Sequence, residues 1–101
     1  MNQEDPVGAE ATISAVGEFT ILNRYGIHAR PAALFVKTAG RFSCEVSVEK
    51  DGVSVSGKSI MGLLTLEGHQ GALLKVTAVG SDADEAVRAL EELILGRFNE
   101  D

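Results

Sequence analysis

The alternation of apolar and polar residues between positions 42 and 55 most constrains the fold of this chain. Apolar side chains mark one face, at Phe42, Cys44, Val46 and Val48, and polar ones the other, at Ser43, Glu45, Ser47 and Glu49. The pair Asp51-Gly52 is a strong two-residue hairpin turn, and Val53 and Val55 continue the alternation beyond it. The pattern predicts two antiparallel strands with one apolar face each, and therefore a sheet that is open to water on one side. We interpret Cys44 as part of the core rather than as a reactive thiol.

The remaining elements can be arranged around this hairpin. Apolar periodicity predicts a strand over residues 18–22, a helix that ends near residue 38, a short helix over residues 59–68, a strand over residues 72–80 and a final helix from Asp82. Asp82 and Glu85 have the spacing of a capping box at the start of that last helix. The order strand, helix, strand, strand, helix, strand, helix predicts a two-layer α+β fold, because the helices must cover the apolar face of the sheet.

The domain boundary is predicted near residue 17. Residues 1–17 are small and acidic, have no clear period and contain two chain breakers, so we expect a flexible N-terminal extension. The chain has 101 residues, which leaves one domain over residues 18–101. No apolar stretch approaches the roughly 20 residues of a membrane helix, and the N-terminus lacks the layout of a signal peptide. We therefore expect a cytoplasmic protein.

The chain is acidic overall but basic in one stretch. Its net charge of −6 argues against broad binding to nucleic acid or to anionic membranes. No acidic residue occurs between Glu18 and Glu45, a stretch that contains Arg24, Arg30, Lys37 and Arg41. This patch fits an anionic ligand or an acidic partner surface, and a chance run of solvated basic residues is the alternative. With one cysteine and two histidines, the sequence predicts neither an internal disulfide nor a metal site.

The stretch "YGIHARPAAL" places His28 at the expected start of the first helix. Pro31 fits the first turn of a helix, where its missing N–H removes no helical bond. Unpaired N–H groups and the helix dipole attract phosphate to such a site, and they disfavour a second positive charge, so they favour a neutral, nucleophilic imidazole. Arg30 could hold a phosphoryl group through its planar guanidinium. From spacing alone, His28 is either a phosphate-accepting histidine or a surface histidine at a helix start.

A second feature is "GKSIMG", where Ser59 is a normal N-cap candidate for the short helix. Ile60, Met61 and Leu63 are followed by a further leucine, which is too many apolar residues for one narrow stripe. We therefore expect some of them to be exposed as a docking surface. A phosphate on Ser59 would place negative charge on that surface. The simpler interpretation of Ser59 is a structural N-cap only.

These two motifs resemble a known family when they are taken together with the order of elements. "GIHARPA" and "GKSIMGLLTLEGHQGALLKVTAVGSDADEAVRALEEL" are similar to the histidine-containing phosphocarrier (HPr) family of the bacterial phosphoenolpyruvate-dependent phosphotransferase system. The resemblance extends over residues 18–94. It implies an α+β open-faced β-sandwich, in which a four-stranded antiparallel sheet is covered on one face by three helices in the order βαββαβα.

The resemblance implies a role for each matching residue. His28 matches the histidine that takes a phosphoryl group on Nδ1 from Enzyme I and passes it to enzyme II A domains, and Arg30 matches the arginine that assists. Ser59 matches the serine that an HPr kinase/phosphorylase modifies in many bacteria. The surface for Enzyme I and, in some bacteria, for a transcriptional regulator is implied at Ile60, Met61 and Leu63, and we expect Arg24 to add basic steering. We expect a monomer without a cofactor and without independent turnover of a small-molecule substrate.

The physiological pathway stays open at the level of sequence. The tail "LGRFNED" is closer to the nitrogen-related branch of the family, while "KSIMG" is closer to the kinase-regulated branch. The alternative is a regulatory protein of the same fold, nitrogen-related or in carbon control, that acts through phosphorylation-dependent partner binding rather than sugar uptake. Tyr25 stands where Asn or an aliphatic residue is common. A nucleic-acid module is disfavoured, because the predicted open face carries Ser43, Glu45, Ser47, Glu49 and Thr77 and no aromatic residue.

Overall fold

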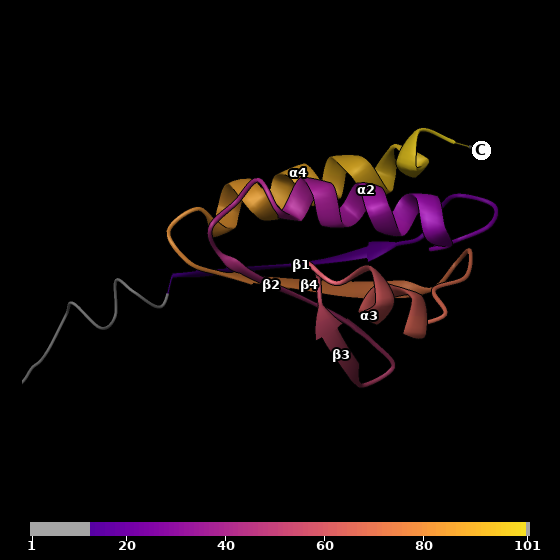
Figure 1. The fold of residues 1–101 in the computed structure, drawn as a ribbon, viewed down its shortest axis with the longest axis horizontal. Helices are drawn as coiled ribbons and strands as arrows, with labels where there is room; N and C mark the ends of the chain where they lie inside the picture. Colours follow the sequence, from indigo (N-terminus) through magenta and orange to yellow (C-terminus); the bar gives the residue numbers. More distant parts are fainter. Residues whose placement is uncertain (1–12, 101) are drawn as a thin grey trace, which may run out of the picture.

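The computed structural model describes residues 13–100, which form four strands and three α-helices (Figure 1). In chain order the elements are β1 (Ser14–Thr20), α2 (Ala29–Ala39), β2 (Glu45–Lys50), β3 (Val53–Ser56), α3 (Ile60–Thr65), β4 (Leu73–Val79), α4 (Ala83–Leu95) and the short turn η1 (Arg97–Asn99). Among these residues, no helix has the length and hydropathy needed to span a membrane. The order of elements is the one predicted from the sequence.

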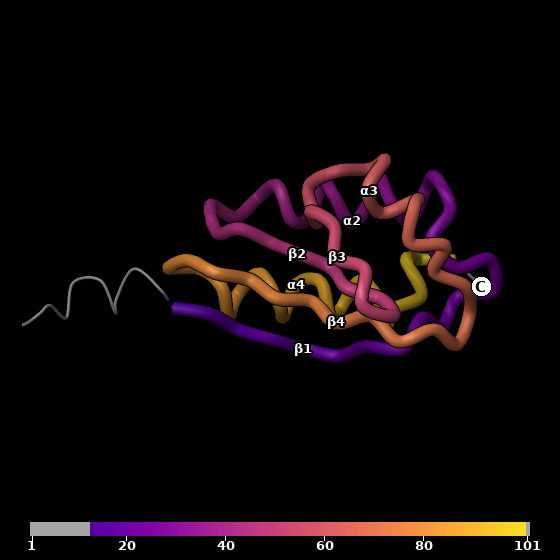
Figure 2. Tube along the Cα trace, turned by 90° about the horizontal axis from the view of Figure 1, so that it is seen from below, coloured from indigo at the N-terminus to yellow at the C-terminus, as the bar shows by residue number. Residues whose placement is uncertain are grey.

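The four strands form one sheet in the order β1-β4-β2-β3, and every neighbouring pair is antiparallel (Figure 2). α2 and α4 lie side by side over one face of this sheet, and α3 packs against α2 and β3 (Figure 1). The fold is therefore the expected α+β open-faced β-sandwich, with the second face of the sheet uncovered by any helix of the described chain.

The core lies between the sheet and the helices. Inward positions of β2 and β4 are buried, as predicted; they are Val46, Val48, Leu74, Val76 and Ala78. The outward positions between them are polar, and the two ends of β4 expose apolar side chains, Leu73 and Val79. The helices face the inward positions with Phe35, Leu90 and Ile94. The predicted hairpin turn is confirmed by positive φ angles at both Asp51 and Gly52. Cys44 is buried in this core, as expected.

The first strand begins earlier than predicted. β1 starts at Ser14, so residues 14–17 of the expected extension are paired with the far end of β4, from Ser14 opposite Val79 to Gly17 opposite Val76. The alternation of apolar and polar residues is weak in this part of β1 because small residues occupy its inward positions. Gly17 has no room for a larger residue, since a Cβ there would lie 2.3 Å from the ring of Phe19. Residues 1–12, where the rest of the expected extension lies, are outside the described part of the chain.

Asp82 does not form the predicted capping box. It is the N-cap residue of α4, but its side chain makes no cap hydrogen bond. Its carboxylate instead accepts hydrogen bonds from the backbone N–H groups of Ser43 (2.8 Å) and Cys44 (3.0 Å). These bonds, that from Ser43 above all, lower the pKa of Asp82 below its ordinary 3.8. The residue therefore ties the start of α4 to the chain just before β2.

The two backbone hydrogen bonds to Asp82, which we call the Asp82 clamp, give a testable pH dependence of stability. Because the folded state lowers the pKa of Asp82, its contribution to stability is present above pH 3.8 and is lost as the pH falls through the lower, folded-state value. We expect Asp82→Asn to lower the urea midpoint at pH 7 and to leave a smaller difference from wild type in acid. Asp84→Asn is the matched control, since Asp84 shares the first turn of α4 and is exposed. Equal effects of the two variants at all pH values would contradict the clamp.

Candidate functional site around His28

His28 sits at the N-terminus of α2 and is held there by its backbone. It is the N-cap residue with extended backbone (φ −93°, ψ −168°), and its side chain makes no cap hydrogen bond. The preceding residue, Ile27, donates its N–H to the carbonyl of Gly68 (2.7 Å). Gly26 has φ +67°, and a Cβ there would lie 2.1 Å from the oxygen of Gly68. The close approach of two loops, which only glycine permits at position 26, thus fixes the position of His28.

The imidazole of His28 contacts a carboxylate that the sequence did not predict. His28 Nε2 lies 2.9 Å from Glu100 Oε1, and Arg30 Nη1 lies 3.2 Å from Glu100 Oε2. Asn23, which is fully buried, donates from Nδ2 to the same Oε1 at 3.0 Å. These partners, His28 first and then Asn23, lower the pKa of Glu100 below its ordinary 4.5. His28, Arg30 and Glu100 therefore form one polar cluster, which we call the His28 cluster.

The chain reaches this cluster through an unusual turn after α4. Arg97, Phe98 and Asn99 all have positive φ angles, of 59°, 53° and 61°. The ring of Phe98 is completely buried, and its carbonyl accepts a 3.5 Å hydrogen bond from Arg30 Nη1. The sequence signal that could have found this turn is a large apolar residue, Phe98, two positions beyond the helix stop at Gly96. The left-handed backbone and the buried ring together direct Glu100 back toward α2.

Tyr25 lies beside the histidine and is largely exposed. Its ring is edge-on to the imidazole of His28, with 6.3 Å between the centroids. The guanidinium of Arg24 lies over the Tyr25 ring at 5.3 Å from its centroid. Tyr25, at 69% exposure, and Arg24 thus extend the surface of the His28 cluster toward solvent.

Ser59 is the N-cap of α3, as predicted, and its Oγ accepts a 3.0 Å hydrogen bond from the N–H of Gly62. Ile60 and Met61 are exposed, at 41% and 72%. Leu63 is not: it is 2% exposed and belongs to the core. The prediction for Leu63 was wrong, because at about 100° per residue position 63 lies roughly opposite the exposed Met61 on α3, and its side chain packs in the core. The exposed apolar surface beside Ser59 is therefore Ile60 and Met61.

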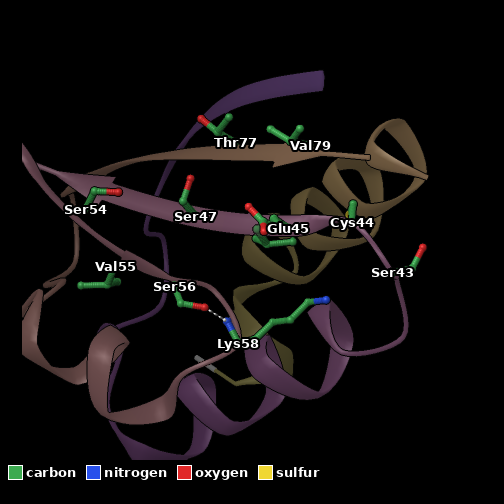
Figure 3. Close-up of a pocket in the computed structure, with 11 residues that line it drawn as sticks. Ser43, Cys44, Glu45, Ser47, Ser54, Val55, Ser56, Lys58, Thr77 and Val79 are labelled. Atoms are coloured by element: carbon green, nitrogen blue, oxygen red, sulfur yellow. Dashed lines mark hydrogen bonds between the residues drawn. The ribbon is translucent and has the colours of Figure 1, made fainter. Parts of the chain in front are cut away.

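A hollow lies away from the His28 cluster, on the outward face of the sheet (Figure 3). It has a volume of about 510 Å³, and its lining combines hydroxyl side chains, among them Ser47, Ser56 and Thr77, with apolar ones such as Val55 and Val79. Lys58 crosses its rim, with Nζ donating to the carbonyl of Phe42 at 2.8 Å. None of the residues of the His28 cluster lines this hollow. No group of three or more metal-ligating side chains occurs within residues 13–100.

Comparison with known proteins identifies the family of this chain. The family described as the HPr component phosphorylation site of the phosphotransferase system matches residues 9–95. The phosphocarrier protein HPr of Pseudomonas aeruginosa is 48% identical over 84 residues, which cover 82% of this chain and 93% of that protein. HPr of Neisseria meningitidis is 45% identical over 80 residues, or 79% of this chain and 90% of that protein.

Solved structures give the same result. The crystal structure of HPr-C-His from Thermoanaerobacter tengcongensis superposes with a TM-score of 0.83 at 47% identity, over 86% of this chain and 98% of that one. HPr from Bacillus anthracis gives a TM-score of 0.77 at 41% identity, over 80% of this chain and 96% of that one. The chain therefore belongs to the HPr phosphocarrier family of the phosphotransferase system.

Proposed function

We propose that this chain accepts a phosphoryl group from Enzyme I on Nδ1 of His28 and passes it to enzyme II A domains. The observation that carries the proposal is the orientation of the imidazole. Nε2 is occupied by Glu100, whereas Nδ1 has no hydrogen-bond partner among residues 13–100. The side chain of His28 is 43% exposed, so a partner protein can reach it. Membership of the phosphocarrier family supports the same role.

The proposed transfer is an in-line displacement at phosphorus. The lone pair on Nδ1 of His28 forms the new N–P bond, and the bond from phosphorus to the donor atom of Enzyme I breaks, with its electron pair returning to that atom. Such transfers need positioning and charge stabilisation more than further covalent chemistry. The N–H groups of Ala29 and Arg30 lie in the first turn of α2, and Pro31 contributes none. The guanidinium of Arg30 is 58% exposed and supplies the positive charge.

Phosphorylation with purified Enzyme I and phosphoenolpyruvate tests the proposal. We expect one phosphate per chain that is labile to acid, stable to alkali and assigned to Nδ1 of His28 by NMR. The phosphate should then move to an enzyme II A domain when that domain is added. Phosphate that appears only with ATP and a kinase, and only on Ser59, would instead establish the regulatory alternative.

We propose a second role for Ser59, as a site of regulation by an HPr kinase/phosphorylase. This rests on the position of Ser59 next to Ile60 and the exposed side chain of Met61, a surface suited to transient docking. A phosphate on Ser59 would add negative charge at the rim of that surface. A transcriptional regulator that recognises the phosphorylated form is the corresponding partner.

We expect Ser59→Asp to reduce kcat/KM for phosphorylation by Enzyme I by about tenfold, a change of roughly 1.4 kcal/mol. The physical reason is unfavourable charge and desolvation at an apolar docking surface. The fold should persist, because aspartate also accepts the N-cap hydrogen bond. Ser59→Asn is the matched control, since it keeps the cap without the charge. Equal rates for both variants and the wild type in a coupled transfer assay would remove the regulatory role.

A further inference from the structure

Within residues 13–100, the carboxylate of Glu100 is the one side-chain group that contacts both His28 and Arg30. Oε1 faces His28 Nε2 at 2.9 Å and Oε2 faces Arg30 Nη1 at 3.2 Å. We propose that Glu100 is a positioning residue for phosphoryl transfer, which selects the tautomer of His28 and balances the charge of its phosphorylated ring. This inference rests on the proposed function of His28 and adds a role for the C-terminal segment.

The first part of the role follows from the chemistry of a neutral imidazole. One ring nitrogen carries a proton and the other a lone pair, and the hydrogen bond at one nitrogen selects the state of the other. An ionised carboxylate only accepts hydrogen bonds. Glu100 therefore holds the proton of His28 on Nε2, which leaves the lone pair on Nδ1. The nucleophile is then already in its reactive form when a phosphoryl donor arrives.

The second part concerns charge during the reaction. When neutral His28 attacks through Nδ1, it keeps the proton on Nε2, so the ring becomes cationic as the N–P bond forms. The proton stays on Nε2, and no other acceptor is needed. The carboxylate 2.9 Å away stabilises this developing charge, as a carboxylate stabilises an imidazolium in other histidine-dependent catalysts. When the phosphoryl group leaves to the next acceptor, the ring returns to the same neutral tautomer.

The surroundings of Glu100 hold its carboxylate in this position. Its side chain is 19% exposed, whereas those of His28 and Arg30 are 43% and 58% exposed. Asn23 Nδ2 donates both to Glu100 Oε1 and to the carbonyl of Gly26 at 2.8 Å, which ties the carboxylate to the turn that precedes His28. The buried ring of Phe98 anchors the backbone two residues earlier. The carboxylate is thus fixed from two sides before any partner binds.

Two substitutions separate the parts of this role. Glu100→Gln keeps an oxygen that can accept the Nε2 proton but removes the charge, whereas Glu100→Ala removes both. Glu92→Gln is the matched control, because Glu92 is an exposed carboxylate on α4 outside the His28 cluster. The tautomer is read from the ¹⁵N shifts of the His28 ring in the unphosphorylated full-length protein. The transfer step is read from single-turnover phosphorylation by saturating phosphorylated Enzyme I.

We expect Glu100→Ala to shift the ¹⁵N signals of His28 away from the Nε2-protonated form and to slow the single-turnover rate by about tenfold, the scale of one charge-assisted hydrogen bond at a partly exposed site. Glu100→Gln should keep the wild-type ¹⁵N pattern and still slow transfer, and Glu92→Gln should change neither. The concentration of Enzyme I that gives half the maximal rate should stay unchanged, because Glu100 acts on the chemical step.

Wild-type ¹⁵N shifts and wild-type transfer rates in Glu100→Ala would overturn the inference while His28 phosphorylation stands. A wild-type protein that accepts no phosphate on His28 would overturn the proposed function instead, and the ¹⁵N measurement would still decide whether Glu100 selects the tautomer. A lower melting temperature of Glu100→Ala with unchanged ¹⁵N shifts and rates would assign Glu100 a purely structural role, and so would also overturn the inference.

Discussion

His28→Ala is expected to abolish phosphorylation by Enzyme I and phosphoenolpyruvate while the protein stays folded. The imidazole makes no N-cap hydrogen bond, so its removal costs α2 no backbone contact. Glu100 keeps hydrogen bonds from Asn23 and Arg30 in the variant. The loss should therefore be in chemistry alone, with no phosphate incorporated over the time in which the wild type is fully modified. Intact-mass spectrometry at neutral or alkaline pH measures the phosphate, and circular dichroism the fold.

His69→Ala is the control for this experiment. His69 is the only other histidine of the chain and lies in the exposed loop between α3 and β4. Its substitution should leave the stoichiometry of one phosphate per chain unchanged. Acid-labile phosphate that persists in His28→Ala and disappears in His69→Ala would show that His69 carries the phosphate, and would contradict the proposed role of His28.

Most of the fold could be predicted because its signals are local in the sequence. The alternation from Phe42 to Val48 and the Asp51-Gly52 turn fix the β2–β3 hairpin with a period of two, which neighbouring residues alone reveal. The start of β1 could not be predicted, because Ala15 and Gly17 face inward with side chains too small to show the period. Leu63 was misplaced for a related reason: in a helix of six residues, spacing alone does not decide which apolar side faces inward.

The residues of the candidate site could likewise be predicted only where their signals are local in the sequence. His28, Arg30 and Ser59 belong to short motifs at helix starts, where residue type and spacing indicate a role. Glu100 is separated from His28 by 72 positions, and only the three-dimensional path of the tail brings them together. The wrong prediction of a capping box has the same origin, since Asp82 accepts its hydrogen bonds from Ser43 and Cys44 rather than from within its own helix.

This non-local carboxylate changes the electrostatic picture of the site. The sequence shows a basic stretch without an acid from Arg24 to Arg41, and a positive helix start at His28. In the folded chain, the carboxylate of Glu100, from the acidic C-terminal end, lies against His28 and Arg30 within that stretch. Arg30 is therefore an ion-pair partner of Glu100 in the free protein, and in the proposed transfer an incoming phosphoryl group has to compete with Glu100 for the guanidinium.

The second large effect is expected from Phe98→Ala. The ring of Phe98 is completely buried, and truncation of a buried phenylalanine costs about 3–5 kcal/mol of the free energy of unfolding. Left-handed backbone is unfavourable for residues other than glycine, so the turn at residues 97–99 needs this anchor. Urea denaturation measures the cost. Phe98→Leu is the control, since it keeps most of the apolar volume and should cost less than about 1.5 kcal/mol.

Phe98→Ala also links the stability of the tail to the chemistry of the histidine. If the anchored turn is what brings Glu100 to His28, the ¹⁵N shifts of the His28 ring in Phe98→Ala should move in the same direction as in Glu100→Ala, although position 98 does not contact the imidazole. Phe98→Leu should retain the wild-type shifts. A destabilisation below about 1 kcal/mol in Phe98→Ala, with an unchanged His28 spectrum, would mean that the contacts of Asn23 and Arg30 alone hold Glu100 in place.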